Sequence, residues 1–137
     1  LENFRAVDRG VLLGARSFWE GVDVPGQALS VLVIVRLPFD VPSDPIIAAR
    51  SETFEQPFVE YSLPEAVLRF RQGFGRLIRG QSDRGVVVVF DRRVRSKRYG
   101  QQFLGSLPAC TIKYGPVNLM PETAARWIDA RKENPES

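Results

Sequence analysis

Two mainly apolar runs constrain this chain most. Residues 86–90 read Val-Val-Val-Val-Phe, and residues 28–37 form a longer run rich in β-branched side chains. Neither run alternates apolar with polar residues, and continuous apolar strands are what a parallel sheet covered on both faces requires. Shorter runs at Val11–Gly14 and, more weakly, at Thr111–Tyr114 add candidate strands. The sequence therefore predicts an α/β fold with a small, mainly parallel sheet of three or four strands.

Helix-start and helix-stop signals fall between and after these strands. Asp44 is a good N-cap in front of Pro45, and Ser62 followed by Glu65 has the capping-box spacing. The expected helices cover Pro45–Phe54, Pro64 to Ile78 or Arg79, Ser96–Ser106 and Pro121–Lys132. This order is an α/β pattern. We expect one domain over residues 1–133 and a disordered polar tail over residues 134–137.

Residue types that are scarce or missing exclude several classes of function. The 137 residues contain no histidine, which excludes Ser-His-Asp and Cys-His catalysis within the chain and most zinc sites. The single cysteine, Cys110, excludes an internal disulfide and a metal site built on several thiolates. No apolar run approaches the ~20 residues that cross a bilayer, and charged residues interrupt the N-terminal stretch where a signal peptide is apolar. We therefore expect a cytoplasmic protein with no metal site and no membrane partner.

Positive charge is concentrated in one short segment. The net charge is only +3, but five of the seven residues from Arg92 to Arg98 are cations. Such a run is most often a solvated helix start or loop. The leading alternative is a contact with a nucleic-acid backbone.

The expected helix from Pro64 to Arg79 has two distinct faces at roughly 100° per residue. One face is an apolar stripe made of Val67, Phe70, Phe74, Leu77 and Ile78. On the opposite side, Gln72, Arg76 and Arg79 fall within an arc of about 60°. The simplest interpretation of this second face is a solvated polar surface.

Two details favour a ligand instead. Gly73 and Gly75 lie inside the helix, where each costs about 1 kcal/mol relative to alanine, so they indicate close approach of another backbone or of a ligand. Arginines also suit phosphate oxygens, because a guanidinium donates two parallel hydrogen bonds and stays charged.

Several segments resemble one family of motor proteins. Residues 72–79 (QGFGRLIR) resemble motif VI, Q-x-x-G-R-x-x-R, of superfamily 2 helicases. Residues 17–26 (SFWEGVDVPG) resemble motif V of the DinG branch, which is related to XPD. Further matches follow in the order of the family: Leu37-Pro38-Phe39, Asp44-Pro45, residues 61–64, Asp91-x-Arg93, Lys97-x-Tyr99-Gly100 and residues 103–108.

The resemblance implies a fold and a division of labour. In such helicases two RecA-like domains of the P-loop NTPase type, each a three-layer sandwich, clamp ATP and move along single-stranded DNA. The matching residues belong to the second domain. Arg79 would be the arginine finger on the γ-phosphate, Arg76 its partner on the phosphates, and Gln72 would position the γ-phosphate and the attacking water.

Other residues receive roles from the same resemblance. Asp23 would contact the ribose side of the nucleotide or link ATP to the domain interface, and Gly21, like Gly75, would allow close approach of the backbone. The DNA path would include Ser17, Trp19 and Arg36, with Phe39 and the run from Arg92 to Arg98 as further candidates. Two of these residues have simpler explanations. Asp23 before Val-Pro-Gly is equally suited to a turn, and Trp19 is more often a packing residue than a base-stacking platform.

Features of the family that this sequence lacks are assigned by the resemblance to the first domain. The sequence contains no G-x-x-x-x-G-K-[ST] loop and no acidic box, so ATP and Mg²⁺ would be bound mainly elsewhere in the parent protein. An iron–sulfur cluster, if the parent has one, would also lie outside this chain. The motif IV strand and helix should precede Leu1. The resulting unpaired sheet edge would favour self-association.

Three hypotheses follow. The first is the C-terminal motor domain of an ATP-dependent, 5′–3′ DNA helicase of the bacterial nucleoid, inactive on its own and working with the first RecA-like domain on single-stranded DNA. The second is a stand-alone nucleic-acid-binding or interaction module with a helicase-like fold and no ATPase activity. The third, a generic nucleotide-binding α/β domain, is weaker because the glycine-rich phosphate loop is missing.

Overall fold

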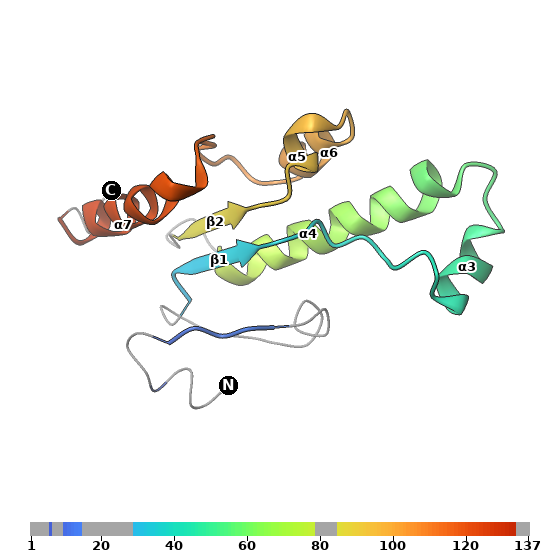
Figure 1. Cartoon of the computed structure of the whole chain (residues 1–137), viewed down its shortest axis with the longest axis horizontal. Coiled ribbons are helices and arrows are strands. Elements are labelled where there is room, and N and C mark those ends of the chain that lie inside the picture. Colours follow the sequence, from blue (N-terminus) through green and yellow to red (C-terminus); the bar gives the residue numbers. More distant parts are fainter. Residues whose placement is uncertain (1–5, 7–9, 15–28, 79–84, 134–137) are drawn as a thin grey trace.

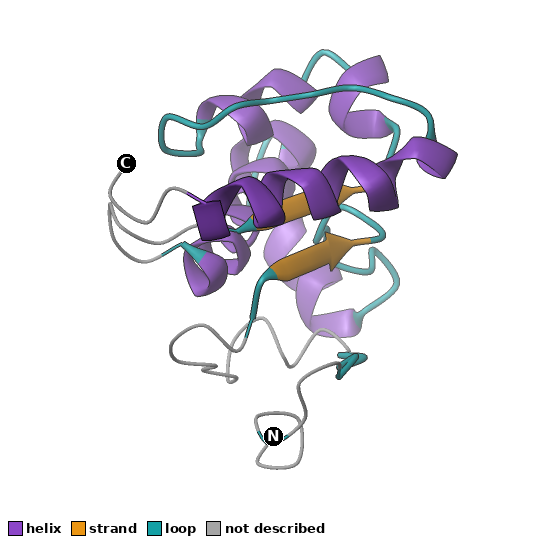
Figure 2. Ribbon diagram, turned by 90° about the vertical axis from the view of Figure 1, so that its left-hand side faces the viewer, coloured by secondary structure: helices purple, strands orange, loops and turns teal. Residues whose placement is uncertain are grey.

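A small parallel sheet lies at the centre of the fold. The computed structural model describes residues 6, 10–14, 29–78 and 85–133. Strand β1 (Val31–Ile34) pairs in parallel with β2 (Val86–Val89), with Val31 opposite Val86 and Ile34 opposite Val89. The two arrows point the same way in Figure 1, and Figure 2 shows the same pair surrounded by helices. The predicted α/β class with a small parallel sheet is confirmed.

Helices make up most of the remaining described structure. Their bounds are Pro45–Ser51 (α3), the π-helical turn Phe58–Ser62 (η2), Leu63–Leu77 (α4), Arg93–Ser96 (α5), Gly100–Gly105 (α6), the 3-10 turn Val117–Leu119 (η3) and Met120–Glu133 (α7). The longest, α4, runs beside β1, while α7 lies against β2 (Figure 1). Helix α3 lies beyond the carboxyl end of β1, at the far end of α4.

The N-cap of α3 is confirmed, but its end is not. The Asp44 carboxylate accepts hydrogen bonds from the backbone N–H groups of Ile46 at 2.9 Å and Ile47 at 3.5 Å. The helix ends at Ser51 rather than at Phe54. The Thr53 hydroxyl donates to the Arg50 carbonyl at 2.7 Å, and such local side-chain hydrogen bonds compete with continuation of a helix.

The predicted capping box at Ser62 is wrong. Ser62 itself has helical φ and ψ angles of −63° and −41°, and its side chain makes no capping hydrogen bond. The chain is already helical from Phe58, because the π-helical turn runs directly into α4. The Glu60 carboxylate instead accepts from the Gln56 N–H at 3.2 Å, one turn earlier. At the other end, α4 stops at Leu77, with the predicted terminal residue Ile78 as its C-cap.

The single helix predicted over Ser96–Ser106 is also wrong. The chain forms two short helices, α5 and α6, separated by an extended Lys97 with φ −106° and ψ 144°. Gly100 explains the sharp connection, since a Cβ there would lie 2.0 Å from the Val94 carbonyl oxygen. The last helix, in contrast, confirms its prediction, because α7 covers the expected residues with one more at each end.

Two of the predicted strands do not form. Residues 11–14 and 111–114 are described and lie outside any strand. The side chains of Val11 and Leu13 are 85% and 88% exposed. A strand needs a hydrogen-bonded neighbour, and the sheet of the described residues has only the two strands β1 and β2. Self-association through a sheet edge stays a prediction.

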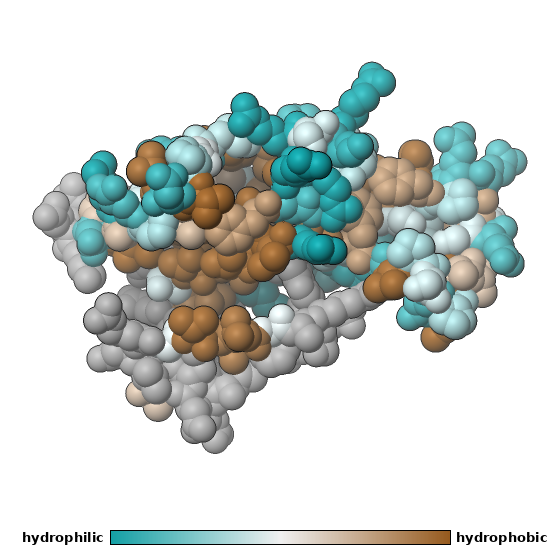
Figure 3. All heavy atoms as spheres, in the orientation of Figure 1, coloured by the Kyte–Doolittle hydropathy of each residue, from teal (hydrophilic) through white to brown (hydrophobic). Residues whose placement is uncertain are grey.

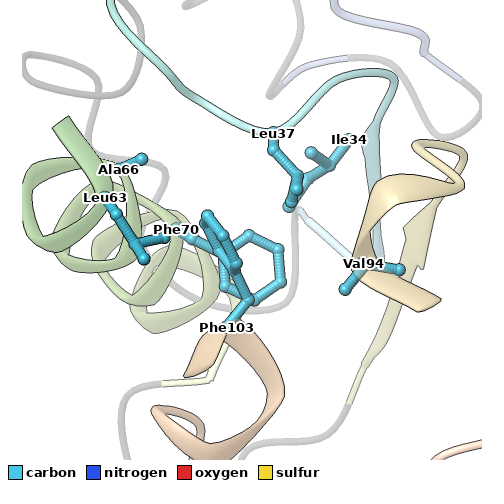
Figure 4. Packing of buried hydrophobic residues seen from close by; sticks show 7 residues of the cluster. All are labelled: Ile34, Leu37, Leu63, Ala66, Phe70, Val94 and Phe103. Atoms are coloured by element: carbon cyan, nitrogen blue, oxygen red, sulfur yellow. The ribbon is translucent and has the colours of Figure 1, made fainter. Parts of the chain in front are cut away.

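The core lies where β1 ends. Ile34 and Leu37 pack there with Phe70 of α4 and Phe103 of α6, all at most 3% exposed (Figure 4). The rings of Phe70 and Phe103 meet edge to face, with centroids 5.4 Å apart and planes at 89°. This packing sets the position of α4 relative to the exit of β1.

Replacing Phe70 with alanine tests this core. We expect Phe70→Ala to lower the free energy of unfolding by about 3–5 kcal/mol, because it leaves a cavity against Phe103. Chemical denaturation of the chain measures the difference. Leu68→Ala on the exposed side of the same helix is the control and should cost less than about 1 kcal/mol. Equal losses in the two variants would contradict this account of the core.

Candidate functional site

The outward side of α4 carries three of the residues expected to face a nucleotide. Gln72 and Gly75 are exposed and Arg76 is half-buried. The opposite side is buried through Leu63, Ala66, Phe70, Gly73, Phe74 and Leu77. A Cβ built on Gly75 would meet no heavy atom within 4 Å, so the space in front of this glycine is open in the described structure. The two-faced helix expected from the sequence is therefore present.

The remaining residues of the candidate nucleotide site, together with two of the DNA candidates, lie outside the described part of the chain. Arg79 follows Ile78, the C-cap of α4 and the last described residue of this segment. Ser17, Trp19, Gly21 and Asp23 all belong to the segment 15–28. Their roles stay predictions, and the geometry below concerns the described residues alone.

Helix α4 is tied to the segment that follows β1 by a buried ion pair. The Arg69 guanidinium lies 2.8 Å from the Asp40 carboxylate, and the two side chains are 13% and 3% exposed. Arg69 also lies 3.6 Å from Glu65, one turn earlier. Breaking a buried pair leaves a charge without compensation, so this contact fixes the helix relative to the chain that carries Arg36.

Arg36 lies in a basic hollow at the carboxyl end of the sheet. We name it the strand-exit hollow; its volume is about 720 Å³ and it is lined by Val35, Arg36, Phe90, Asp91, Arg92, Arg93, Ser96 and Lys97. The lining comes from the exit of β1, the exit of β2 and the short helix α5 with its C-cap. Arg36 therefore meets part of the predicted basic run, although the two are more than fifty residues apart in the sequence. None of the three α4 residues lines this hollow.

One carboxylate holds the two exits together. Asp91 Oδ2 accepts from the Leu37 backbone N–H at 2.9 Å, immediately after Arg36. Asp91 Oδ1 accepts from the Arg93 backbone N–H at 3.0 Å, and the Arg93 guanidinium donates to both oxygens at 2.6–3.0 Å. These contacts form what we name the Asp91 clasp, made of Asp91, Arg93 and the Leu37 N–H.

The electrostatics of the clasp follow from these hydrogen bonds. Hydrogen bonds from the Arg93 side chain, and to a smaller extent from the N–H groups of Leu37 and Arg93, together lower the pKa of Asp91 to about 2, against an opposing effect of burial. The hydrogen bond to the Asp91 carboxylate in turn raises the pKa of Arg93. Arg93 also lies over the Phe39 ring, 5.4 Å from its centroid. Phe39 in turn packs against Phe58, Tyr99 and Phe103, so the clasp is joined to the core.

Reasoning from the sequence missed two residues of this region. The resemblance marks Asp91 only as part of a matching Asp-x-Arg, although a carboxylate directly after an apolar strand and before two arginines is a signal for an anchored turn. The apolar run predicts Phe90 as the last residue of a buried strand, yet it is 39% exposed and lines the hollow.

Neither a metal-binding cluster nor a membrane-spanning helix occurs among the described residues. Among the described residues, no group of three or more histidine, cysteine, aspartate or glutamate side chains is placed to hold a metal ion. None of the described helices has the length and apolar content needed to cross a membrane.

Comparison with known proteins identifies the family of the chain. The helicase C-terminal domain family matches residues 1–110. The chain belongs to this family. The match contains both motif-like segments, residues 17–26 and 72–79, and ends before η3 and α7.

Individual relatives are similar over most of the chain. The chain is 47% identical over 112 residues to the ATP-dependent DNA helicase YoaA of Haemophilus influenzae, covering 79% of this chain and 18% of that protein. It is 45% identical over 116 residues to the 3'-5' exonuclease DinG of Bacillus subtilis, covering 82% and 12%. It is 42% identical over 112 residues to the ATP-dependent helicase DinG of Mycobacterium tuberculosis, covering 79% and 17%. The chain thus spans less than a fifth of the length of these relatives.

The Asp91 clasp gives a pH-dependent contribution to stability. The pKa of Asp91 is about 2 in the folded chain, against roughly 3.9 for an unfolded aspartate, so the ionised form is favoured by folding. Its stabilisation is fully present above about pH 4 and is lost as the pH falls through about 2. At pH 7 we expect Asp91→Asn to lower the free energy of unfolding by roughly 2 kcal/mol.

Denaturant unfolding of both forms between pH 7 and pH 2 measures this difference. It should shrink as the pH falls below 4. The control is Glu55→Gln, which neutralises an exposed carboxylate and should change the free energy of unfolding by less than about 0.5 kcal/mol. A difference that stays constant down to pH 2 would show that Asp91 stabilises the fold by some means other than its charge.

Proposed function

We propose that this chain is the second motor domain of an ATP-dependent DNA helicase and completes an ATP site from one side. The family match over residues 1–110 supports this, together with the outward position of Gln72, Gly75 and Arg76 on α4. Two of the three relatives above are ATP-dependent helicases by name. The parent protein, rather than this chain alone, would carry the activity.

The chemistry assigned to α4 is stabilisation of charge. Hydrolysis of ATP develops negative charge on the γ-phosphate oxygens, and an arginine finger lowers that barrier substantially. Arg79 would be the finger and Arg76 would hold neighbouring phosphate oxygens, since a guanidinium donates in a planar fork. Gln72 would orient the attacking water. Gly75, with open space in front of its Cα, suits close approach of the phosphates.

The rest of the ATP site would come from another domain of the parent. The sequence has no phosphate-binding loop and no acidic box, so ATP and Mg²⁺ would be held mainly there. Gly21 and Asp23 would meet the nucleotide or the domain interface. Whether the parent also holds an iron–sulfur cluster is independent of this chain, which has one cysteine.

Contacts within the domain would pass a displacement of α4 from the proposed ATP site to the proposed DNA path. Arg69 lies on α4 one turn before Gln72 and is paired with Asp40, which follows Arg36 on the exit of β1. A closely packed interior transmits a displacement of α4 rather than absorbing it. A movement of Arg76 towards the phosphates would therefore carry the segment of Arg36, which belongs to the proposed DNA path.

Replacing the proposed finger tests this function. In the full-length parent we expect Arg79→Ala to reduce DNA-stimulated ATP hydrolysis by at least about 10³-fold while changing nucleotide affinity only a few-fold. A phosphate-release assay measures the first quantity, and titration with a fluorescent ATP analogue measures the second. The isolated chain should hydrolyse no ATP in the same assay.

Arg71→Ala is the matched control, because it removes an exposed arginine of α4 that lies on a different face from Gln72 and Arg76. It should leave hydrolysis within about twofold of the unmodified parent. Normal ATP hydrolysis in the Arg79→Ala variant would contradict the role proposed for Arg79. A parent with no ATPase activity but intact DNA binding would favour the stand-alone binding module instead.

A further inference from the structure

We propose that the strand-exit hollow binds single-stranded DNA, with Arg36, Arg92 and Lys97 on the phosphates and one base stacked on Phe90. This deepens the proposed function, on which it rests, by assigning a DNA subsite outside the motif-like segments. The residues concerned are not those that the family resemblance marks for ATP.

Positive charge in the hollow comes from separate pieces of chain. Its lining has four cations and one carboxylate, which leaves three net positive charges. Arg36 follows β1, Arg92 follows β2, and Lys97 ends α5; all three are exposed. In Figure 3, hydrophilic side chains gather just beyond the ends of the two strands, next to an apolar band over the strands themselves. Cations spread over three segments suit a chain of phosphates better than a single small anion.

An exposed aromatic ring distinguishes this hollow from a merely charged surface. Phe90 is 39% exposed and Val35 beside it in the lining is 66% exposed. Aromatic rings set among cations are the usual platform for single-stranded nucleic acid, because every base has a face that can stack. A duplex buries those faces. The ring therefore favours a single strand as the ligand.

The Asp91 clasp prepares the site before any ligand arrives. It holds the Leu37 N–H next to Arg36 and the Arg93 N–H next to Arg92, so both arginines leave the backbone from fixed positions. Fixing the loops in advance reduces the entropy lost on binding. The Asp91 carboxylate is paired with the Arg93 guanidinium, and this pairing limits the repulsion between Asp91 and a phosphate of the ligand. Asp91 and Arg93 are thus positioning residues.

The experiment separates charge from stacking. Fluorescence anisotropy of the full-length parent with a fluorescein-labelled oligothymidylate gives the affinity at several salt concentrations. Arg36→Gln, Arg92→Gln and Lys97→Gln should each weaken binding several-fold and reduce the salt slope by about 0.7. Phe90→Ala should weaken binding about tenfold with no change in slope. The same Phe90→Ala variant should bind a duplex of equal length as the unmodified parent does.

Arg71→Gln is the matched control for charge, since Arg71 is an exposed arginine of α4 that does not line the hollow. It should change neither affinity nor slope. Equal weakening by Arg71→Gln would overturn the proposal in favour of non-local attraction. Unchanged binding in Phe90→Ala, or in all three charge variants, would overturn it too.

Failure of this proposal and failure of the helicase function are distinguishable. A parent whose ATPase is stimulated by single-stranded DNA, but whose hollow variants bind normally, would refute the hollow and keep the helicase. A parent without ATPase activity whose hollow variants lose affinity as described would keep the hollow and refute the helicase.

Discussion

The Asp91 carboxylate accepts a backbone hydrogen bond just beyond the end of the ladder between β1 and β2. The last ladder-type contact is the Phe90 N–H donating to the Ile34 carbonyl at 2.9 Å. Beyond it the two strands diverge, and backbone groups near the core need other partners. Asp91 supplies one to Leu37, whose side chain is 3% exposed, and holds Arg93 at the same time. The core beneath the exit of β1 and the charged surface above it therefore depend on one side chain.

A second carboxylate repeats this arrangement on the same exit segment. Asp40 pairs with Arg69 of α4, as Asp91 pairs with Arg93. The Asp40 and Asp91 side chains are 3% and 7% exposed, and leaving a buried carboxylate without its partner is costly, so any arrangement that separates these pairs is penalised. The two pairs thus fix α4 and α5 relative to the end of β1, while Arg36, Arg92 and Lys97 stay exposed around the hollow. Some charged side chains of the described domain therefore hold its elements together, while others are exposed to solvent around the hollow.

Local signals in the sequence predicted much of the fold, and long-range contacts explain the errors. The apolar runs led to β1 and β2, and the apolar stripe led to the buried face of α4, because both depend on periodicity alone. The division between α5 and α6 depends on Gly100 packing against the Val94 carbonyl, which no local pattern marks. Likewise, the sequence suggested Arg36 and the basic run separately. Only the pairing of β1 with β2 brings them to one edge. The family resemblance assigned roles to Gln72, Gly75 and Arg76 on α4 but gave no role to Phe90.

Two surfaces of this domain share no lining residue yet have a common support. The outward face of α4 is backed by Phe70, and the hollow is backed by the Asp91 clasp, Phe39 and Phe103. Phe103 contacts both Phe70 and Phe39. Because a packed interior has low compressibility, α4 cannot tilt without moving Phe103 or opening a void beside it. Under the function proposed above, such stiffness would carry a displacement of α4 to the DNA, whereas a soft connection would absorb it. The proposal therefore gives the aromatic contacts a role beside that of the exposed cations.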